Sequence, residues 1–189
     1  ADTACREVER GLTELDEKTL LFLNNINTIT YELPDGTVGI IEREAIDERV
    51  IQIQKSEGDD FVESHWLRLV GPSSVHGQGP TPLSVAAAFR LVAQQSPQRS
   101  PRSATEGGEG LETKWSVEPL QNGDVCIYFP AVKESSGLRF HVHAPFASTV
   151  ARDSIRDDTG NVQLVADLAL LIAGALPALC AEGLISDSL

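Results

Sequence analysis

The sequence predicts an α+β fold, in which an antiparallel or mixed sheet carries a C-terminal helix packed on one face. Three observations lead to this prediction. An apolar helix near the start is followed by a run of strand-like segments, a second group of strands follows a polar gap, and a long apolar helix closes the chain. Strands and helices that come in separate runs are typical of α+β proteins, because a parallel α/β sheet needs the two to alternate.

The first part of the chain predicts one helix and a four-stranded meander. Residues 13–24 place capping signals at Thr13, Asp16 and Glu17 before five apolar side chains, so we expect a helix that docks on another surface. A Pro-Asp-Gly turn at residues 34–36 separates the first two strands. The predicted strands are residues 26–33, 37–43, 49–55 and 61–70.

The middle of the chain is less regular. Residues 71–82 hold three glycines and three prolines and predict a loop. Residues 83–93 leave two interpretations open, because the alanine triplet favours a helix while the valines, leucines and phenylalanine suit a buried strand. Residues 96–110 consist mostly of Ser, Pro and Gly, and we expect them to form a disordered insertion.

The second part predicts three strands and a helix. The Asn-Gly pair at residues 122–123 is a strong hairpin signal, so we expect residues 114–120 and 125–130 to pair with each other. Residues 139–144 predict another strand. Residues 161–179 predict an apolar helix that Pro177 kinks or ends.

Charge and hydropathy restrict the partners. The 189 residues carry 15 basic and 28 acidic side chains, a net charge of −13, which argues against binding to nucleic acid or to an anionic membrane surface. The longest uncharged apolar stretch, residues 168–181, is shorter than the roughly 20 residues of a spanning helix. We therefore expect a soluble, cytoplasmic protein without a membrane partner.

The acidic surplus is uneven along the chain. Residues 1–60 have a net charge of −9 and the remainder a net charge of −4. Two interpretations remain open: a solvated surface that keeps the protein soluble, or an acidic docking face over residues 26–70 for a basic protein partner.

The three cysteines, Cys5, Cys126 and Cys180, are too far apart for a Cys-x-x-Cys pair and too few for a disulfide framework, which fits a reducing cytosol. Cys126 lies in an apolar run, so we expect a buried, inert thiol. The chain begins with Ala and has no Met, and we expect it to be a piece of a longer protein.

His141 and His143 form one candidate site. Side chains alternate along a strand, so both imidazoles lie on one face of the predicted strand over residues 139–144. The pair is either structural or one edge of a weak metal site. A metal site needs a third ligand, and no Cys or acidic residue falls at a convincing spacing, so we assign no metal.

Arg152 and Arg156 form the other candidate site, within the charged segment 152–158. Local ion pairs on a helical turn are one interpretation. The alternative is that one of the two guanidinium groups contacts a phosphate held by a neighbouring domain, because its planar fork matches phosphate oxygens. No Gly-x-Ser-x-Gly elbow or Gly-Lys-Ser/Thr phosphate loop is present, so we assign no catalytic residue to the chain.

Several segments resemble bacterial GHKL-type ATP-binding proteins of the sacsin-like and heat-shock-chaperone-like kind. The main one is Gly-Leu-Arg-Phe-His-Val-His-Ala-Pro-Phe at residues 137–146, which follows a strand ending in Phe-Pro at residues 129–130 and precedes Arg152. Leu-Leu-Phe-Leu-Asn-Asn-Ile at residues 20–26 resembles the helix that closes the ATP-binding domain in such proteins. Ala-Phe-Arg-Leu at residues 88–91 resembles one of their strands.

The resemblance implies a non-catalytic middle or transducer region, with a fold like the ribosomal-protein-like second domain of GHKL ATPases. Residues 1–25 would end an upstream ATP-binding domain, and residues 26–185 would form the transducer-like domain. Mg-ATP is then implied for the parent protein and no cofactor for this chain. The implied partners are the upstream domain and protein clients. Arg152 matches the basic residue that reaches the γ-phosphate, with Arg156 as the second choice. An autonomous interaction domain with an acidic face remains the alternative.

Overall fold

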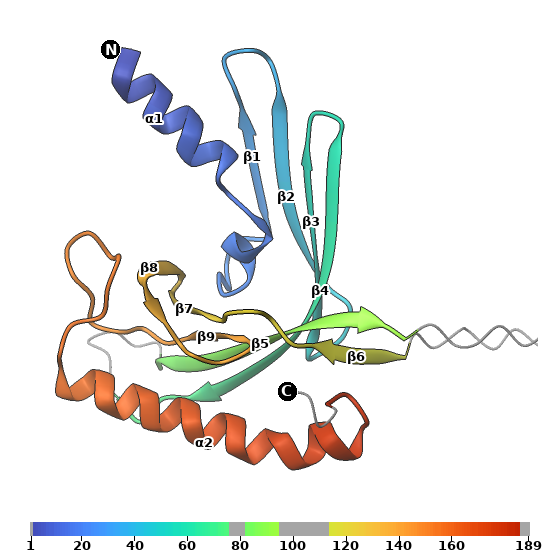
Figure 1. Cartoon of the computed structure of the whole chain (residues 1–189), viewed down its shortest axis with the longest axis vertical. Coiled ribbons are helices and arrows are strands. Elements are labelled where there is room, and N and C mark those ends of the chain that lie inside the picture. The colour runs from blue at the N-terminus through green and yellow to red at the C-terminus, as the bar shows by residue number, and fades with distance from the viewer. Residues whose placement is uncertain (1, 76–81, 95–113, 186–189) are drawn as a thin grey trace, which may run out of the picture.

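A computed structural model of the chain describes residues 2–75, 82–94 and 114–185. Over these residues it is an α+β structure in which one mostly antiparallel sheet of nine strands carries a C-terminal helix (Figure 1), and the α+β class with the helix on one face agrees with the sequence prediction. The expected disordered insertion at residues 96–110 lies outside the described residues. The elements are α1 (Asp2–Thr13), the short 3₁₀ helix η1 (Glu17–Leu20), β1 (Thr28–Glu32), β2 (Val38–Ala45), β3 (Val50–Glu57), β4 (Asp60–Pro72), β5 (Ser84–Ala93), β6 (Trp115–Glu118), β7 (Asp124–Ile127), β8 (Phe129–Ser135), β9 (His141–His143) and α2 (Thr159–Ala181).

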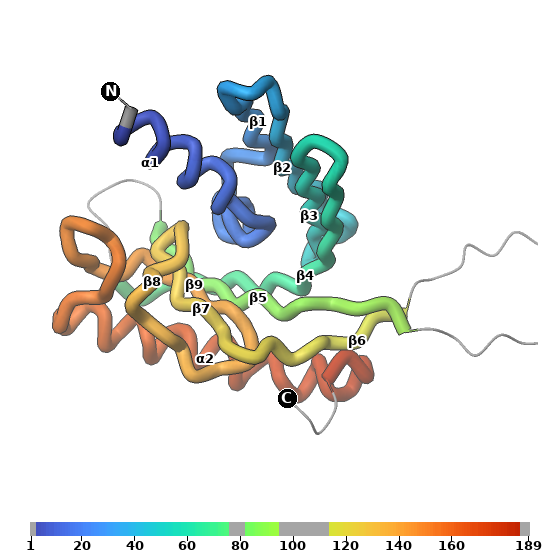
Figure 2. The backbone as a smooth tube through the Cα atoms, turned by 45° about the horizontal axis from the view of Figure 1, so that its top comes forward, coloured from blue at the N-terminus to red at the C-terminus, as the bar shows by residue number. Residues whose placement is uncertain are grey.

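The strands follow the order β1-β2-β3-β4-β5-β9-β7-β8, and β6 lies beside β9 along the same edge of β5. All pairs are antiparallel except β7 with β9. β4 joins the two parts of the sheet, because its first half pairs with β3 and its second half with β5. Figure 2 shows how the chain turns at β4, so that β1–β3 rise away from the layer formed by β5–β9.

Each face of the sheet has its own hydrophobic core. On one face, α2 packs on β4 and β5 through Leu164, Leu168 and Leu179, over a core that includes the rings of Phe89 and Phe140. On the opposite face, Leu20, Leu21 and Phe22 lie on a core built around Ile41, Ile53 and Trp66, with which they form one buried cluster. The sheet is therefore covered on one face by α2 and on the opposite face by residues 20–22.

The predicted meander of residues 26–70 is confirmed as β1–β4, and the ambiguous segment 83–93 is a strand, β5. The predicted helix over residues 13–24 is wrong. The helix lies earlier, at Asp2–Thr13, where it is almost wholly exposed, and Asp16 caps only the four-residue η1. Three consecutive side chains, residues 20–22, are fully buried, which a single helical face does not allow because neighbours on a helix point about 100° apart.

The predicted hairpin between residues 114–120 and 125–130 is also wrong. β6 pairs with β5, whereas β7 pairs with β8 and β9. Gly123 serves a close approach instead, since a Cβ atom there would lie 1.9 Å from the carbonyl oxygen of Phe140. The actual tight turn follows β7, where Tyr128 adopts a left-handed φ of 70° and reverses the chain into β8.

The C-terminal helix is confirmed and extends over Thr159–Ala181, with Pro177 inside it. By length and composition alone α2 is apolar enough to cross a membrane, but Leu164, Leu168 and Leu179 bury one side of it against the sheet. Asp158 caps its first turn by accepting a hydrogen bond from the Gly160 amide at 2.8 Å. Its other side, with Val162 and Leu170, is exposed.

This one-sided packing predicts a large loss of stability on truncating one leucine of α2 and almost none on truncating another. Leu168→Ala removes a side chain that is 6% exposed, so we expect the free energy of unfolding to fall by about 2–5 kcal/mol. Leu170→Ala truncates a side chain that is 73% exposed, and the change should stay within about 0.5 kcal/mol. Urea denaturation of both variants makes the comparison, and equal losses would show that the helix packs differently.

Candidate functional site

The loop between β9 and α2 carries the predicted phosphate-contacting arginines. Its two sides are joined by a bridge between Ser148 and Ile155 and by the hydrogen bond from the Arg156 amide to the Ala147 carbonyl oxygen, at 2.9 Å. Arg152 lies near the tip with a left-handed φ of 57°, and its amide donates to the Thr149 carbonyl oxygen at 3.0 Å. The loop is thus a short hairpin-like projection with a defined backbone.

Asp153 fastens this projection to β8. Its Oδ2 forms an ion pair with Lys133 Nζ at 2.6 Å, and its Oδ1 accepts a hydrogen bond from Thr149 Oγ1 at 2.9 Å. The hydrogen bond from Lys133, followed by that from Thr149, lowers the pKa of the Asp153 carboxyl group. Glu134 adds a second attachment by accepting from the Ile155 amide at 2.9 Å.

Asn161, in the first turn of α2, holds the base of the same loop. Its Nδ2 donates to the carbonyl oxygens of Ala147 at 2.9 Å and Arg156 at 2.8 Å, while its Oδ1 accepts from the Ala147 amide at 2.8 Å. Because this side chain is buried, its three hydrogen bonds fix the position of the loop relative to the helix.

Arg152 and Arg156 are both exposed, and neither side chain forms an ion pair with any of the described residues. The local ion pairs considered for segment 152–158 are therefore not formed there, and Asp153 pairs with Lys133 of β8 instead. Val150, beside the tip, is fully exposed. The loop therefore carries the exposed side chains of Arg152 and Val150 on a backbone that hydrogen bonds hold in place.

His141 and His143 point into the core beneath residues 20–22, opposite Ala88 and Ala86 of β5. The small alanine side chains leave room for the imidazole rings. The Phe22 ring stacks on His143 at a centroid distance of 5.1 Å, and Trp66 lies 5.3 Å from His141.

Both imidazoles contact the backbone through Nδ1. His141 Nδ1 accepts from the Asp124 amide at 2.9 Å, and His143 Nδ1 lies 3.2 Å from the Tyr128 amide and 3.1 Å from the Cys126 carbonyl oxygen. Burial lowers the pKa of each histidine to about 4, so both rings are neutral at pH 7. Within the described ranges, no group of three His, Cys, Asp or Glu residues could hold a metal ion. Both imidazole rings are thus buried and packed against aromatic side chains.

Lys18 connects η1 to the start of β7, beside His141 of β9. Its Nζ lies 2.9 Å from Asp124 Oδ2 and 3.1 Å from Asp16 Oδ2, and Asp124 Oδ2 lies 3.5 Å from His141 Nδ1. Burial alone would lower the pKa of Lys18, but the two carboxylates raise it above its ordinary value. The ion pair therefore holds residues 17–22 against β7.

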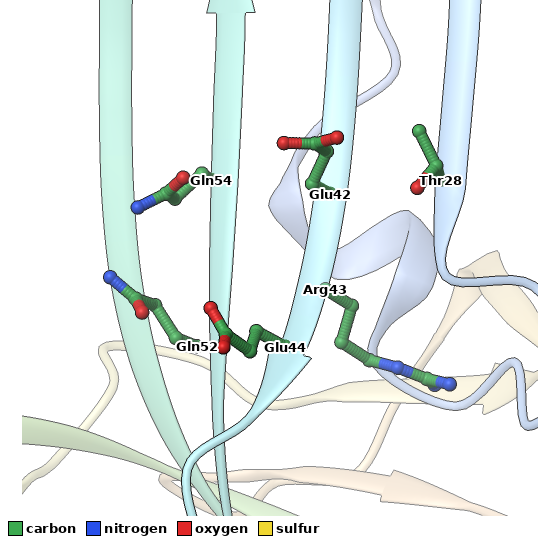
Figure 3. A pocket seen from close by; sticks show the side chains of 6 residues that line it. All are labelled: Thr28, Glu42, Arg43, Glu44, Gln52 and Gln54. Atoms are coloured by element: carbon green, nitrogen blue, oxygen red, sulfur yellow. The ribbon is translucent and has the colours of Figure 1, made fainter.

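The outer face of β1–β3 carries a shallow depression of about 220 Å³ (Figure 3). The residues that line it are Thr28, Glu42, Arg43, Glu44, Gln52 and Gln54, and the Arg43 side chain extends away from the others. This polar face lies in the segment proposed above as an acidic docking surface.

Strand alternation places two further arginines on the inner face of the sheet, although no function was assigned to them from the sequence. Arg43 lies between Ile41 and Ala45, and Arg68 lies between Trp66 and Val70. An arginine that alternates onto the same side of a strand as buried residues can be recognised in the sequence. Its surroundings cannot, because they depend on residues 20–27, whose path the sequence did not predict.

Comparison of the chain with protein-family models, with curated proteins and with solved structures finds no match. The class that the structure itself defines is an α+β protein with a mostly antiparallel nine-stranded sheet and one C-terminal helix.

The depressed histidine pKa values predict a loss of stability in mild acid. The unfolded chain binds protons as the pH falls through about 6.5, while the folded chain resists protonation until about pH 4. The contribution of the neutral histidines to the free energy of unfolding is therefore fully present above about pH 6.5. It is lost progressively as the pH falls toward 4, by up to about 3 kcal/mol per histidine. Urea denaturation from pH 7.5 to 4.5 measures the slope. His143→Gln should make the slope less steep, because one of the two histidines is removed. An unchanged slope would contradict the low pKa assigned to His143.

Proposed function

We propose that this chain is a non-catalytic, transducer-like module of a bacterial GHKL-type ATP-binding protein, and that it relays nucleotide state from an upstream ATP-binding domain to protein clients. The observation that carries the proposal is the presentation of Arg152. An exposed guanidinium group stands on a loop braced by Asp153 and Asn161, directly after the Phe-His-Val-His-Ala-Pro-Phe segment that resembles this family.

Such an arrangement suits contact with a phosphate in another domain. An arginine supplied from outside a nucleotide pocket stabilises the negative charge that develops during phosphoryl transfer. The brace matters because a loop that is already ordered loses less conformational entropy when it docks. Arg156 is the second candidate, although it lies at the base of the loop beside Asp157 and Asp158, whose negative charges oppose contact with a phosphate.

In this proposal Mg-ATP is bound by the parent protein, and the chain itself contributes no catalytic residue and needs no cofactor. We place the protein in the cytoplasm, without nucleic-acid or membrane partners, because the net charge of −13 repels polyanionic surfaces. The partners are protein surfaces: the upstream domain and the clients.

The exposed side of α2 supports a protein partner. Val162 is 68% exposed and Leu170 73%, and a groove of about 480 Å³ runs between α2 and β7–β8, lined mostly by apolar side chains such as Val165, Phe140 and Phe146. Apolar surfaces of this kind on a small protein mark interaction sites.

An autonomous interaction domain with an acidic docking face is the alternative, and one observation favours it. Leu20, Leu21 and Phe22 are buried in the core of this chain, so the segment that resembles the end of an ATP-binding domain packs on the sheet described here. The face with Glu42 and Glu44 would then receive a basic partner (Figure 3).

Arginine substitution in the parent protein tests the first proposal. Arg152→Ala should lower the rate of ATP hydrolysis by about 10³-fold, the lower end of the effect of an arginine supplied in this way. Arg90→Gln is the matched control: Arg90 lies on β5 and is paired with Glu118 of β6, so its replacement should leave the rate unchanged. Steady-state turnover at saturating ATP provides the measurement.

Turnover in Arg152→Ala that equals the wild-type rate would remove the phosphate-sensing role. The acidic-face alternative would then be supported if Glu42→Lys combined with Glu44→Lys abolished partner binding while the fold was retained.

A further inference from the structure

A second depression, of about 270 Å³, lies at the inner face of the sheet where β2 and β4 meet the segment 20–27. Arg43, Arg68 and Asn27 line its inner part, and Arg49, Asp47 and Glu48 line the part near the β2–β3 turn. This basic site is built from β2 and β4, whereas the Arg152 loop lies between β9 and α2.

Arg43 is half-buried, and within the described part of the chain its hydrogen bonds go to neutral groups. Its Nη1 donates to the carbonyl oxygens of Leu20, at 3.1 Å, and Leu23, and its Nη2 donates to the Asn24 carbonyl oxygen at 3.3 Å and to Asn27 Oδ1 at 2.7 Å. Burial lowers the pKa of this guanidinium group. These contacts place the arginine at the end of η1, where carbonyl oxygens are unpaired, but they supply no formal negative charge.

Arg68, on β4, is less well compensated. Its Nη2 donates to Asn24 Oδ1 at 3.0 Å, whereas its buried Nε has no hydrogen-bond partner among the described residues. Burial lowers the pKa of Arg68, and the nearby charge of Arg43 lowers it further. The charge of Arg68 also contributes to the lowered pKa of His143, after the larger effect of burial.

The carboxylates at this depression do not neutralise the two arginines. Neither Arg43 nor Arg68 has an ion pair with any residue in the described part of the chain. Asp47 Oδ1 accepts the amides of Arg49 and Val50, both at 2.7 Å, and the Arg49 side chain pairs with Glu182 at 2.9 Å. Glu48 is on the exposed rim. Two half-buried cations that repel each other without an anion are costly.

We propose that this depression binds a phosphate-type oxyanion between Arg43 and Arg68, with the amide of Asn27 as an additional hydrogen-bonding group. Arg68 keeps its Nη1 hydrogens and one Nη2 hydrogen for such a ligand, whereas the Nη hydrogens of Arg43 already bind the segment 20–27, so Arg43 contributes its charge. A bound dianion would supply the negative charge that the site lacks. The ligand is free phosphate or the phosphate of a modified side chain. Its binding would tie the segment 20–27 to β2 and β4.

The test uses the full 189-residue chain at pH 7.5, with inorganic phosphate and O-phosphoserine as probes. Each probe is titrated by isothermal calorimetry and amide NMR against sodium chloride at matched ionic strength. We expect saturable binding with shifts at Asn24, Asn27, Arg43 and Arg68. Tighter binding of phosphoserine would identify a modified side chain as the source, and tighter inorganic phosphate would identify the free ion. A response no larger than that of chloride for both probes overturns the proposal.

Arg68→Gln makes the assignment specific. Removing a half-buried cation relieves its repulsion from Arg43, so this variant should remain folded and be at least as stable as the wild type in chloride. Its phosphate affinity should fall by at least about tenfold, in line with the loss of a charge-assisted hydrogen bond. Arg90→Gln, whose arginine is paired with Glu118, should bind like the wild type.

Equal affinity in Arg68→Gln and the wild type would overturn the site. If Arg68→Gln does not fold, Arg68→Lys keeps the charge but removes the planar fork, and it should bind phosphate at least several-fold more weakly. Wild-type affinity in the lysine variant would contradict the proposed geometry. Because these measurements involve no ATP hydrolysis, their outcome is independent of the role proposed for Arg152.

Discussion

The packing of residues 20–22 on the inner face of the sheet is the contact on which the rest of the structure depends. Phe22 stacks on His143, and the neighbouring leucines complete a core around Trp66. The ion pair from Lys18 to Asp124 fixes the same segment from the other side. Without this cover, the imidazoles and the apolar side chains of five strands, β2–β5 and β7, would face water, at a cost of roughly 25 cal/mol for each Å² of apolar surface.

The two-faced sheet also explains where the proposed sites lie. β4 pairs with β3 and with β5, so the inner face runs without interruption from the arginine pair at Arg43 and Arg68 to the histidines on β9. The chain then leaves β9 for the Arg152 loop, which Asn161 attaches to α2. β9 therefore contacts Phe22 through His143 and leads directly into the Arg152 loop.

Local sequence patterns predicted the regular parts of this fold and failed where tertiary contacts decide. Alternation in β1–β4 was informative because each strand buries one side. The helix predicted over residues 13–24 failed because Leu20, Leu21 and Phe22 are all buried, which requires a turn instead of one helical stripe. Asn-Gly indicated a hairpin, but Gly123 is required by the approach of the Phe140 carbonyl group, over a separation that no local pattern reports. The same holds for Arg43, whose partners lie about twenty residues away.

A double-mutant cycle on Phe22 and His143 tests the central claim most directly. Urea denaturation at pH 7.5 would give the free energy of unfolding for Phe22→Leu, His143→Gln and the double variant. If the Phe22 ring packs on the His143 ring and so holds residues 20–22 on β9, the two substitutions are coupled, with an interaction energy of at least about 0.5 kcal/mol. Strictly additive losses would contradict the account, because they would mean that residues 20–22 do not pack on the histidine strand.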